Sequence, residues 1–187
     1  MIYYVLGAAV LGIIAASKNR IVEEVDAVQA QDNWTKFDQW FKEYGARYGV
    51  DWQWLKAIAM NESSLGTAKS VALGMKNPYD IEGSKSYDGL SWGLMQVTIK
   101  TARGLDPFAT EVKLNDPKYS IDLAAKYLSQ LQKIFSTVDA RYIEWVIKSY
   151  NQGPGNSKKE RDGKSQGFAQ EYWERWQRNL ERVRARA

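Results

Sequence analysis

Residues 51–65 read DWQWLKAIAMNESSL, and the rest of the chain is best interpreted outward from this stretch. Asp51 can cap a helix in which Leu55 and Ile58 share one apolar stripe. Glu62 follows Leu55 by seven residues and Ile58 by four, so the stripe ends in a carboxyl. Desolvation there would raise the carboxyl pKa and favour a general acid. The alternative is a frayed helix end that turns Glu62 to solvent.

Four more apolar stripes predict helices on either side of this one. They begin at a cap at Asp32 or Asn33 (ending near Gly45), at the cap-and-proline pair Asp116-Pro117, at Asp139, and at about Gly167, where Phe168, Tyr172, Trp176, Leu180 and Val183 form the last stripe. Residues 66–115, between the second and third helices, are rich in Gly, Ser, Asp and Lys, which favours short strands or loops over long helices. The sequence therefore predicts a mainly α domain with a small loop or strand region.

The N-terminal region differs in character from the rest of the chain. Residues 2–16 are uncharged and apolar, and Lys18 and Arg20 follow them. As a helix this run would be roughly 22 Å long, shorter than a full membrane span of about 20 residues. A signal peptide is the alternative, but no basic residue precedes the run. We therefore expect a hydrophobic anchor over residues 1–20, a linker or helical extension over 21–31, and one domain over 32–187.

Composition narrows the chemistry. The 187 residues include no cysteine and no histidine, which excludes disulfides, Cys or His nucleophiles, Ser-His-Asp triads and zinc sites built on Cys or His. Carboxylate chemistry remains, and no metal or cofactor is implied. The net charge of +4 arises after residue 157, where nine Lys and Arg face five Asp and Glu. That tail is either a contact for an anionic partner or a solvated helix face.

Two further segments stand at informative distances from Glu62-Ser63-Ser64-Leu65. Gly-Leu-Met-Gln-Val-Thr occupies residues 93–98, and Tyr-Asn-Gln-Gly-Pro-Gly occupies residues 150–155. In order and spacing, the three segments resemble the signatures of the soluble lytic transglycosylases and goose-type lysozymes. This resemblance implies an α+β lysozyme-like fold and cleavage of the glycan strands of bacterial peptidoglycan. It departs from the family pattern at Leu65 and Ile99, where an aromatic residue and a proline are usual.

The resemblance also implies roles for the matched residues. Glu62 would be the catalytic acid, and Tyr150 would hydrogen-bond or orient its carboxyl. The residues expected to contact substrate are Ser63, Gly93, Met95, Gln96, Asn151 and Gly153. Structural alternatives stay open, because Tyr150 and Met95 can be core residues, Ser63 a helix-end hydroxyl, and Asn151 and Gly153 a helix terminus.

The reaction type depends on a second carboxylate. An inverting hydrolase needs one about 6.5–9.5 Å from the acid, whereas a lytic transglycosylase uses a single residue as acid and then as base. Asp88 is the candidate second group, and Asp80 and Glu82 are weaker ones. Because only Glu62 is well placed, we favour a transglycosylase that yields 1,6-anhydro products.

Two other classes of protein are consistent with part of the sequence. One is a catalytically idle wall-binding or virion module, and the other is an anchored nucleic-acid-binding protein, which no recognised motif supports. The expected partners are glycan strands of peptidoglycan and, through residues 2–16, a membrane or hydrophobic partner subunits. Lys18 and Arg20 would retain the domain in the cytoplasm, away from its substrate. Delivery from a bacteriophage particle to the periplasmic side would resolve this conflict.

Overall fold

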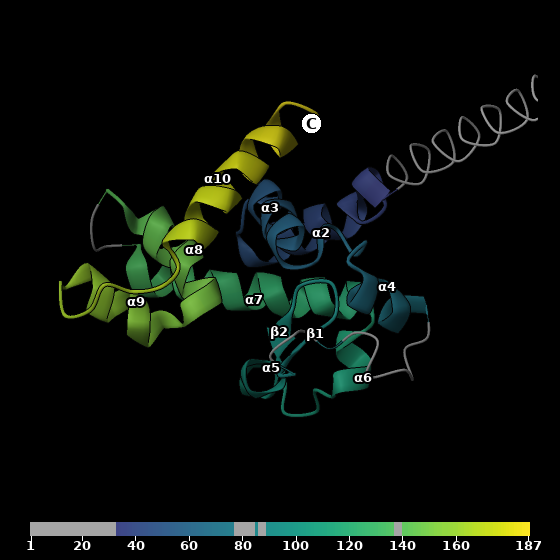
Figure 1. Cartoon of the computed structure of the whole chain (residues 1–187). Coiled ribbons are helices and arrows are strands. Elements are labelled where there is room, and N and C mark those ends of the chain that lie inside the picture. The colour runs from purple at the N-terminus through teal and green to yellow at the C-terminus, as the bar shows by residue number, and fades with distance from the viewer. Residues whose placement is uncertain (1–32, 77–84, 86–88, 137–139) are drawn as a thin grey trace, which may run out of the picture. The chain divides into compact units, whose positions relative to one another are not determined.

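The computed structural model describes residues 33–76, 85, 89–136 and 140–187, and residues 37–187 form one compact unit (Figure 1). The unit is mainly helical, which confirms the expected fold class. Its elements are α2 (Asp38–Tyr48), α3 (Trp52–Ser63), α4 (Lys69–Lys76), β1 (Ser91–Trp92), β2 (Val97–Thr98), α5 (Ile99–Leu105), α6 (Glu111–Leu114), α7 (Pro117–Phe135), α8 (Tyr142–Gln152), α9 (Pro154–Arg161) and α10 (Gln170–Arg184).

The expected anchor over residues 1–20 and linker over 21–31 lie outside the described residues. Within the described ranges, no helix combines the length and apolar character that crossing a membrane requires.

Helix α3 lies at the centre of the domain, against α2, α7 and α10. Asp51 caps it by accepting from the Gln53 N–H at 2.9 Å, and Asp116 caps α7 by accepting from the Lys118 N–H at 2.9 Å. Both caps are those expected from the sequence. Apolar side chains from these helices and from the hairpin form a single core that includes Phe41, Leu55, Ile58, Leu94, Ile121, Leu128, Leu131, Phe135, Val146 and Trp176.

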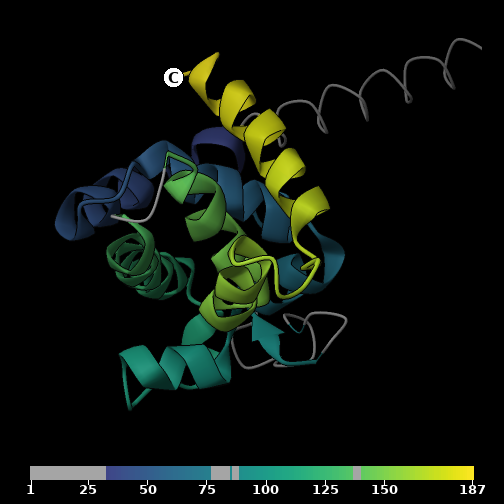
Figure 2. The ribbon, with the colours of Figure 1, turned by 90° about the vertical axis from the view of Figure 1, so that its left-hand side faces the viewer.

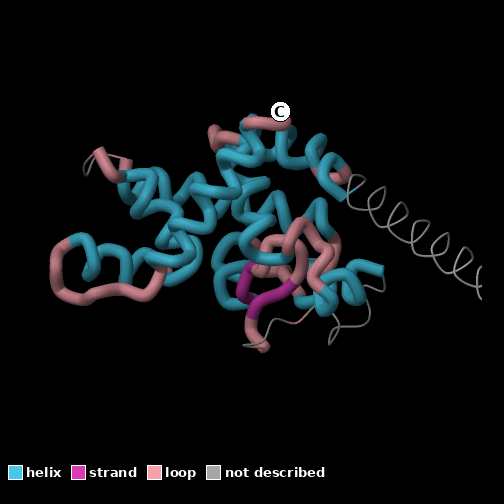
Figure 3. Tube along the Cα trace, turned by 45° about the horizontal axis from the view of Figure 1, so that its top comes forward, coloured by secondary structure: helices cyan, strands magenta, loops and turns pink. Residues whose placement is uncertain are grey.

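The two strands form a short antiparallel hairpin, drawn in magenta in Figure 3. Ser91 pairs with Thr98 and Trp92 with Val97, so residues 93–96 form the connecting loop. Gly93 in this loop has φ +72°, and a Cβ on it would lie 1.8 Å from the carbonyl oxygen of Leu114. Only glycine fits that position. The expected strands are therefore present, but residues 66–115 also contain three short helices that were not expected, α4, α5 and α6.

Several helix limits differ from those expected. Helix α2 begins at Asp38 rather than at Asn33, and it continues past Gly45 to a left-handed cap at Gly49. Gly45 lies inside the helix, at a point where a Cβ would lie only 2.7 Å from the Val50 carbonyl oxygen. Its role is close packing, not termination.

The C-terminal helices also differ. Helix α8 begins at Tyr142, while the expected cap Asp139 lies outside the described residues. Helix α9 was not expected. Phe168, assigned to the last apolar stripe, is 70% exposed because α10 begins only at Gln170. The other four members of that stripe are buried.

A buried polar cluster fixes the joint between α8, α9 and α10, where α10 runs across α8 (Figure 2). The Gln152 amide donates to Ser157 Oγ at 3.1 Å and to Glu160 Oε2 at 2.6 Å, and its oxygen accepts from the Phe168 N–H at 3.0 Å. Lys148 Nζ pairs with the other Glu160 oxygen at 2.6 Å. The Gln152 side chain, at the end of α8, thus contacts both α9 and the loop that precedes α10.

We predict that Gly93→Ala destabilises the domain by more than about 4 kcal/mol, because the added methyl meets backbone that cannot move aside. Gly49→Ala is the matched control, since Gly49 also has positive φ but has open space around its Cα. Left-handed backbone alone costs roughly 1–2 kcal/mol in the control. Urea unfolding of both variants measures the difference, and equal losses would contradict the proposed steric role of Leu114.

Candidate active site

The carboxyl of Glu62 lies at the C-terminal end of α3 and is half-buried. The hydroxyl of Tyr172, on α10, donates a hydrogen bond to Glu62 Oε1 at 2.6 Å. Tyr172 itself is only 5% exposed. Two side chains 110 residues apart in the sequence therefore form a short, partly desolvated contact. A hydrogen bond to an ionisable group in such a place fixes the orientation of the carboxyl.

Other polar contacts position α10 on α3. The Asn61 side chain donates to the Tyr172 carbonyl at 3.0 Å, and Asn179 donates to Asn61 Oδ1 at 2.7 Å. One turn away, the indole of Trp176 donates to the carbonyl of Trp54 at 3.3 Å. These bonds fix α10 where it places the Tyr172 hydroxyl against Glu62.

Ser63 joins the end of α3 to the hairpin loop. Its buried hydroxyl donates to the Leu94 carbonyl at 2.7 Å and accepts from the Gly66 N–H at 2.9 Å. Ser64, Leu65 and Gly66 then follow in left-handed backbone, which ends the helix abruptly. The side chain of Ser63 thus contacts both the hairpin loop and the chain that leaves α3.

The hairpin loop is fixed by a hydrogen bond within the loop and by another to α7. Gln96 has φ +47°, and its side-chain amide donates to the Gly93 carbonyl at 2.7 Å. The side chain of Met95 is fully buried, so it fills the core beneath the loop and does not line an open subsite. Its N–H donates to Ser120 Oγ at 3.2 Å, which fixes the loop on α7.

Tyr150 lies on α8, near the same carboxyl. Its hydroxyl donates to the Met95 carbonyl at 2.9 Å, and its ring packs at 5.7 Å on Tyr127. Tyr150, which was expected to hydrogen-bond or orient the Glu62 carboxyl, holds the loop, and Tyr172 donates to that carboxyl. The negative charge of Glu62, second to burial, raises the pKa of the Tyr150 phenol.

The pKa values of both phenols are raised well above their usual value. Burial is the largest cause for each, because it disfavours the phenolate. The negative charge of Glu62 is the second cause for each, and its hydrogen bond adds to the effect on Tyr172. Both hydroxyls consequently remain protonated donors across the neutral range.

The remaining candidates are more scattered. Asn151 is exposed at the end of α8, and Gly153 follows with φ +79° at the start of α9. The candidate second carboxylate Asp88, like Asp80 and Glu82, lies outside the described residues.

Sequence reasoning did not identify Tyr172 and Asn61 as site residues. Tyr172 falls on an apolar stripe with Trp176 and Leu180, and only its polar tip distinguishes it from a core residue. Asn61 precedes Glu62 but faces α10, a contact that no local pattern encodes.

The described residues thus form a mainly helical domain, with a small two-stranded sheet, in which the Glu62 carboxyl is held at the end of α3; this is a lysozyme-like fold. The family model of the transglycosylase SLT domain matches residues 39–172, and the chain belongs to this family.

Among curated proteins, the chain is similar to membrane-bound lytic murein transglycosylase F 1 of Alkalilimnicola ehrlichii. The two are 28% identical over 127 residues, which is 67% of this chain and 22% of the relative. The chain thus spans about a fifth of the length of that protein.

We predict that Tyr172→Phe makes the stability of the domain less sensitive to alkaline pH. Above pH 10 an unfolded tyrosine ionises while Tyr172 in the fold keeps its proton, so the folded state binds more protons and stability falls as pH rises. Each such group contributes up to about 1.4 kcal/mol per pH unit, a slope reached only well above pH 10. Because the unfolded tyrosine is only half ionised at pH 10, urea unfolding should show that the variant loses about 1.4 kcal/mol less than wild type over the whole interval from pH 9 to 11. An unchanged slope would contradict the buried, hydrogen-bonded phenol.

Proposed function

We propose that this chain is a peptidoglycan lytic transglycosylase that cleaves the glycosidic bond between N-acetylmuramic acid and N-acetylglucosamine. The observation that carries the proposal is the half-buried Glu62 carboxyl, oriented by the 2.6 Å hydrogen bond from Tyr172. Membership of the SLT family and the similarity to a lytic murein transglycosylase support the same activity.

Glu62 acts twice in the proposed reaction. As an acid it transfers its proton to the glycosidic oxygen, and the bond to C1 of the muramic acid breaks through an oxocarbenium-like transition state. As a carboxylate it then removes the proton from the C6 hydroxyl of the same sugar, and that oxygen bonds to C1. The carboxyl regains its proton, no water is consumed, and a 1,6-anhydro ring forms.

Tyr172 serves as a positioning residue in this scheme. Its hydroxyl occupies one carboxyl oxygen of Glu62 in both protonation states, so the plane of the carboxyl stays fixed while the proton moves. Its raised pKa keeps it a donor throughout. Tyr150 fixes the main chain of Met95, and with it the loop that carries Gln96 toward the substrate.

Two alternatives remain distinct from this proposal. A goose-type hydrolase would use Asp88 to activate water, and an idle wall-binding or virion module would bind without cleavage. The idle module is disfavoured because burying the Glu62 carboxyl, even in part, costs folding free energy, and a protein that does not cleave its ligand gains nothing from it. The hydrolase is distinguished from the transglycosylase by the reaction products, which end in a reducing sugar after hydrolysis and in a 1,6-anhydro sugar after transglycosylation.

Glu62→Gln should abolish cleavage of purified peptidoglycan, because glutamine keeps the shape of the side chain but cannot deliver a proton. Loss of general acid catalysis alone corresponds to about 10²–10⁴-fold. Glu171→Gln on the exposed start of α10 is the matched control and should retain full activity. Turbidity loss of sacculi measures the rates, and a Glu62→Gln rate within a few-fold of wild type would exclude Glu62 as the catalytic residue.

The released muropeptides should end in 1,6-anhydro-muramic acid and weigh one water less than hydrolysis products. Asp88→Asn should therefore have little effect on the rate. Mass spectrometry of the digest distinguishes the two outcomes. Reducing-end products together with a severe loss in Asp88→Asn would establish the hydrolase instead.

The place of action follows from the substrate. We propose that residues 2–16 attach the protein to a membrane or to hydrophobic partner subunits, with the domain delivered to the periplasmic side by a virus particle. The name of the relative, a membrane-bound enzyme, is in keeping with attachment. Fractionation of expressing cells should place the full chain with the membranes, whereas a shortened soluble product in the periplasm would show a cleaved signal peptide.

A further inference from the structure

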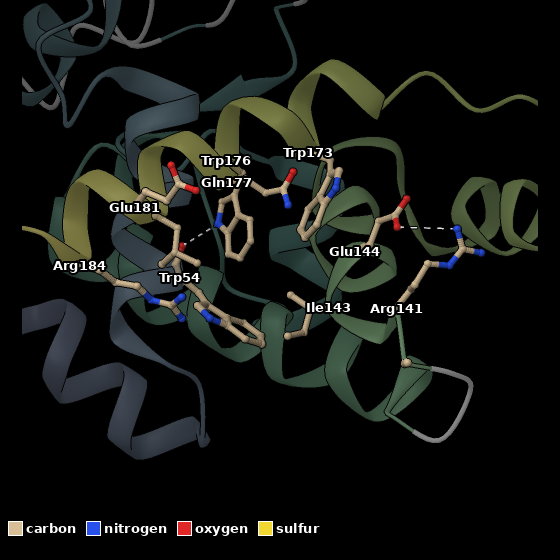
Figure 4. Close-up of a pocket in the computed structure, with 11 residues that line it drawn as sticks. Trp54, Arg141, Ile143, Glu144, Trp173, Trp176, Gln177, Glu181 and Arg184 are labelled. Carbon is tan, nitrogen blue, oxygen red and sulfur yellow. Dashed lines mark hydrogen bonds and ion pairs between the residues drawn. The ribbon is translucent and has the colours of Figure 1, made fainter.

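A hollow lies on the domain, between the N-terminal part of α3, α8 and α10 (Figure 4). It has a volume of about 380 Å³, within the roughly 300–1,000 Å³ typical of small-ligand sites. It belongs to a different part of α3 from the catalytic carboxyl, because Trp54 in its wall precedes Glu62 by eight residues, or about 12 Å of helix rise. The active site does not account for it.

Three tryptophans form the apolar wall of this hollow. The ring of Trp173 stacks on Trp176 with centroids 5.2 Å apart and an angle of 18°, and Trp54 meets Trp176 edge-on at 6.0 Å and 83°. The bond from the Trp176 indole to the Trp54 carbonyl fixes this set. Trp173 is only half-buried, so a ligand can reach an aromatic surface that is already rigid.

Polar side chains surround the aromatic wall. Gln177, Glu181 and Arg184 follow one another along α10 and line the hollow, and all three are exposed. Across the part of the chain that the structure describes, their side chains make no hydrogen bond or ion pair with the protein. On the α8 side, Glu144 is already paired with Arg141 at 3.9 Å and with Lys148 at 2.9 Å. The groups available around the aromatic wall are therefore the amide of Gln177, the carboxylate of Glu181 and the guanidinium of Arg184.

We infer that this hollow binds an N-acetylated amino sugar of the glycan strand, at a distance from the bond being cleaved. A pyranose presents a face of C–H groups that packs on an indole ring, and its hydroxyl and acetamido groups match carboxylate, guanidinium and amide partners. The inference rests on the proposed function for its ligand class. A second contact on the same polymer would raise the local concentration of glycan at Glu62.

The test uses the full chain carrying Glu62→Gln, so that the probe is not cleaved, with tri-N-acetylchitotriose as the probe. The indole N–H signals of Trp54, Trp173 and Trp176 should shift on titration in NMR spectra. Adding Gln177→Ala with Glu181→Ala should weaken the affinity read at these signals by about 5- to 10-fold. Arg178→Ala, exposed on α10 but outside the hollow, is the matched control and should leave that affinity unchanged.

Shifts confined to Trp92, beside the hairpin loop, would place the sugar at the catalytic site alone and overturn the inference. Equal affinities in the double variant and the control would overturn it as well. Because binding is measured without turnover, sugar binding at the three tryptophans can hold even if the chain proves unable to cleave peptidoglycan, and cleavage can hold without it.

Discussion

The buried hydroxyl of Ser63 connects the two segments that every other part of the site depends on. It bonds to the hairpin loop through Leu94 and to the chain leaving α3 through Gly66, so the residue next to Glu62 is fixed from both sides. A carboxyl can serve as acid and base in turn only if it does not swing away between the two steps. For the role proposed for Glu62, Ser63 supplies that constraint through the end of α3, and Tyr172 supplies it at the carboxyl itself.

The two tyrosines near Glu62 contact different parts of the site. Tyr150 holds the Met95 carbonyl, while Tyr172 holds the acid itself. Tyr150 lies on α8 and Tyr172 on α10. These two helices are joined, through the segment around α9, by the hydrogen bonds of the Gln152 side chain. The candidate active site is therefore determined as much by the C-terminal third of the chain as by the segment that contains Glu62.

The features that could be predicted from the sequence are those that depend on neighbouring residues in the chain. Asp51 and Asp116 were identified as caps because a cap needs only its own following N–H groups, and Glu62 was identified because helical periodicity places it on a stripe. Gly45 and Tyr172 were misread or missed, because their roles come from Val50 and Glu62 approaching in space. Expected roles for the residues matched by family resemblance remain proposals, and Asp88 lies outside the described residues.

The way α10 is fastened has a consequence for shortening the protein. The family model matches only as far as Tyr172, yet the helix that carries Tyr172 is held on α3 by residues further along, since Asn179 bonds to Asn61 and Trp176 bonds to Trp54. A truncated chain that stopped at the matched boundary would keep the hydroxyl but lose its support. The smallest autonomous unit therefore extends through the last turns of α10, beyond the limit that sequence similarity alone would set.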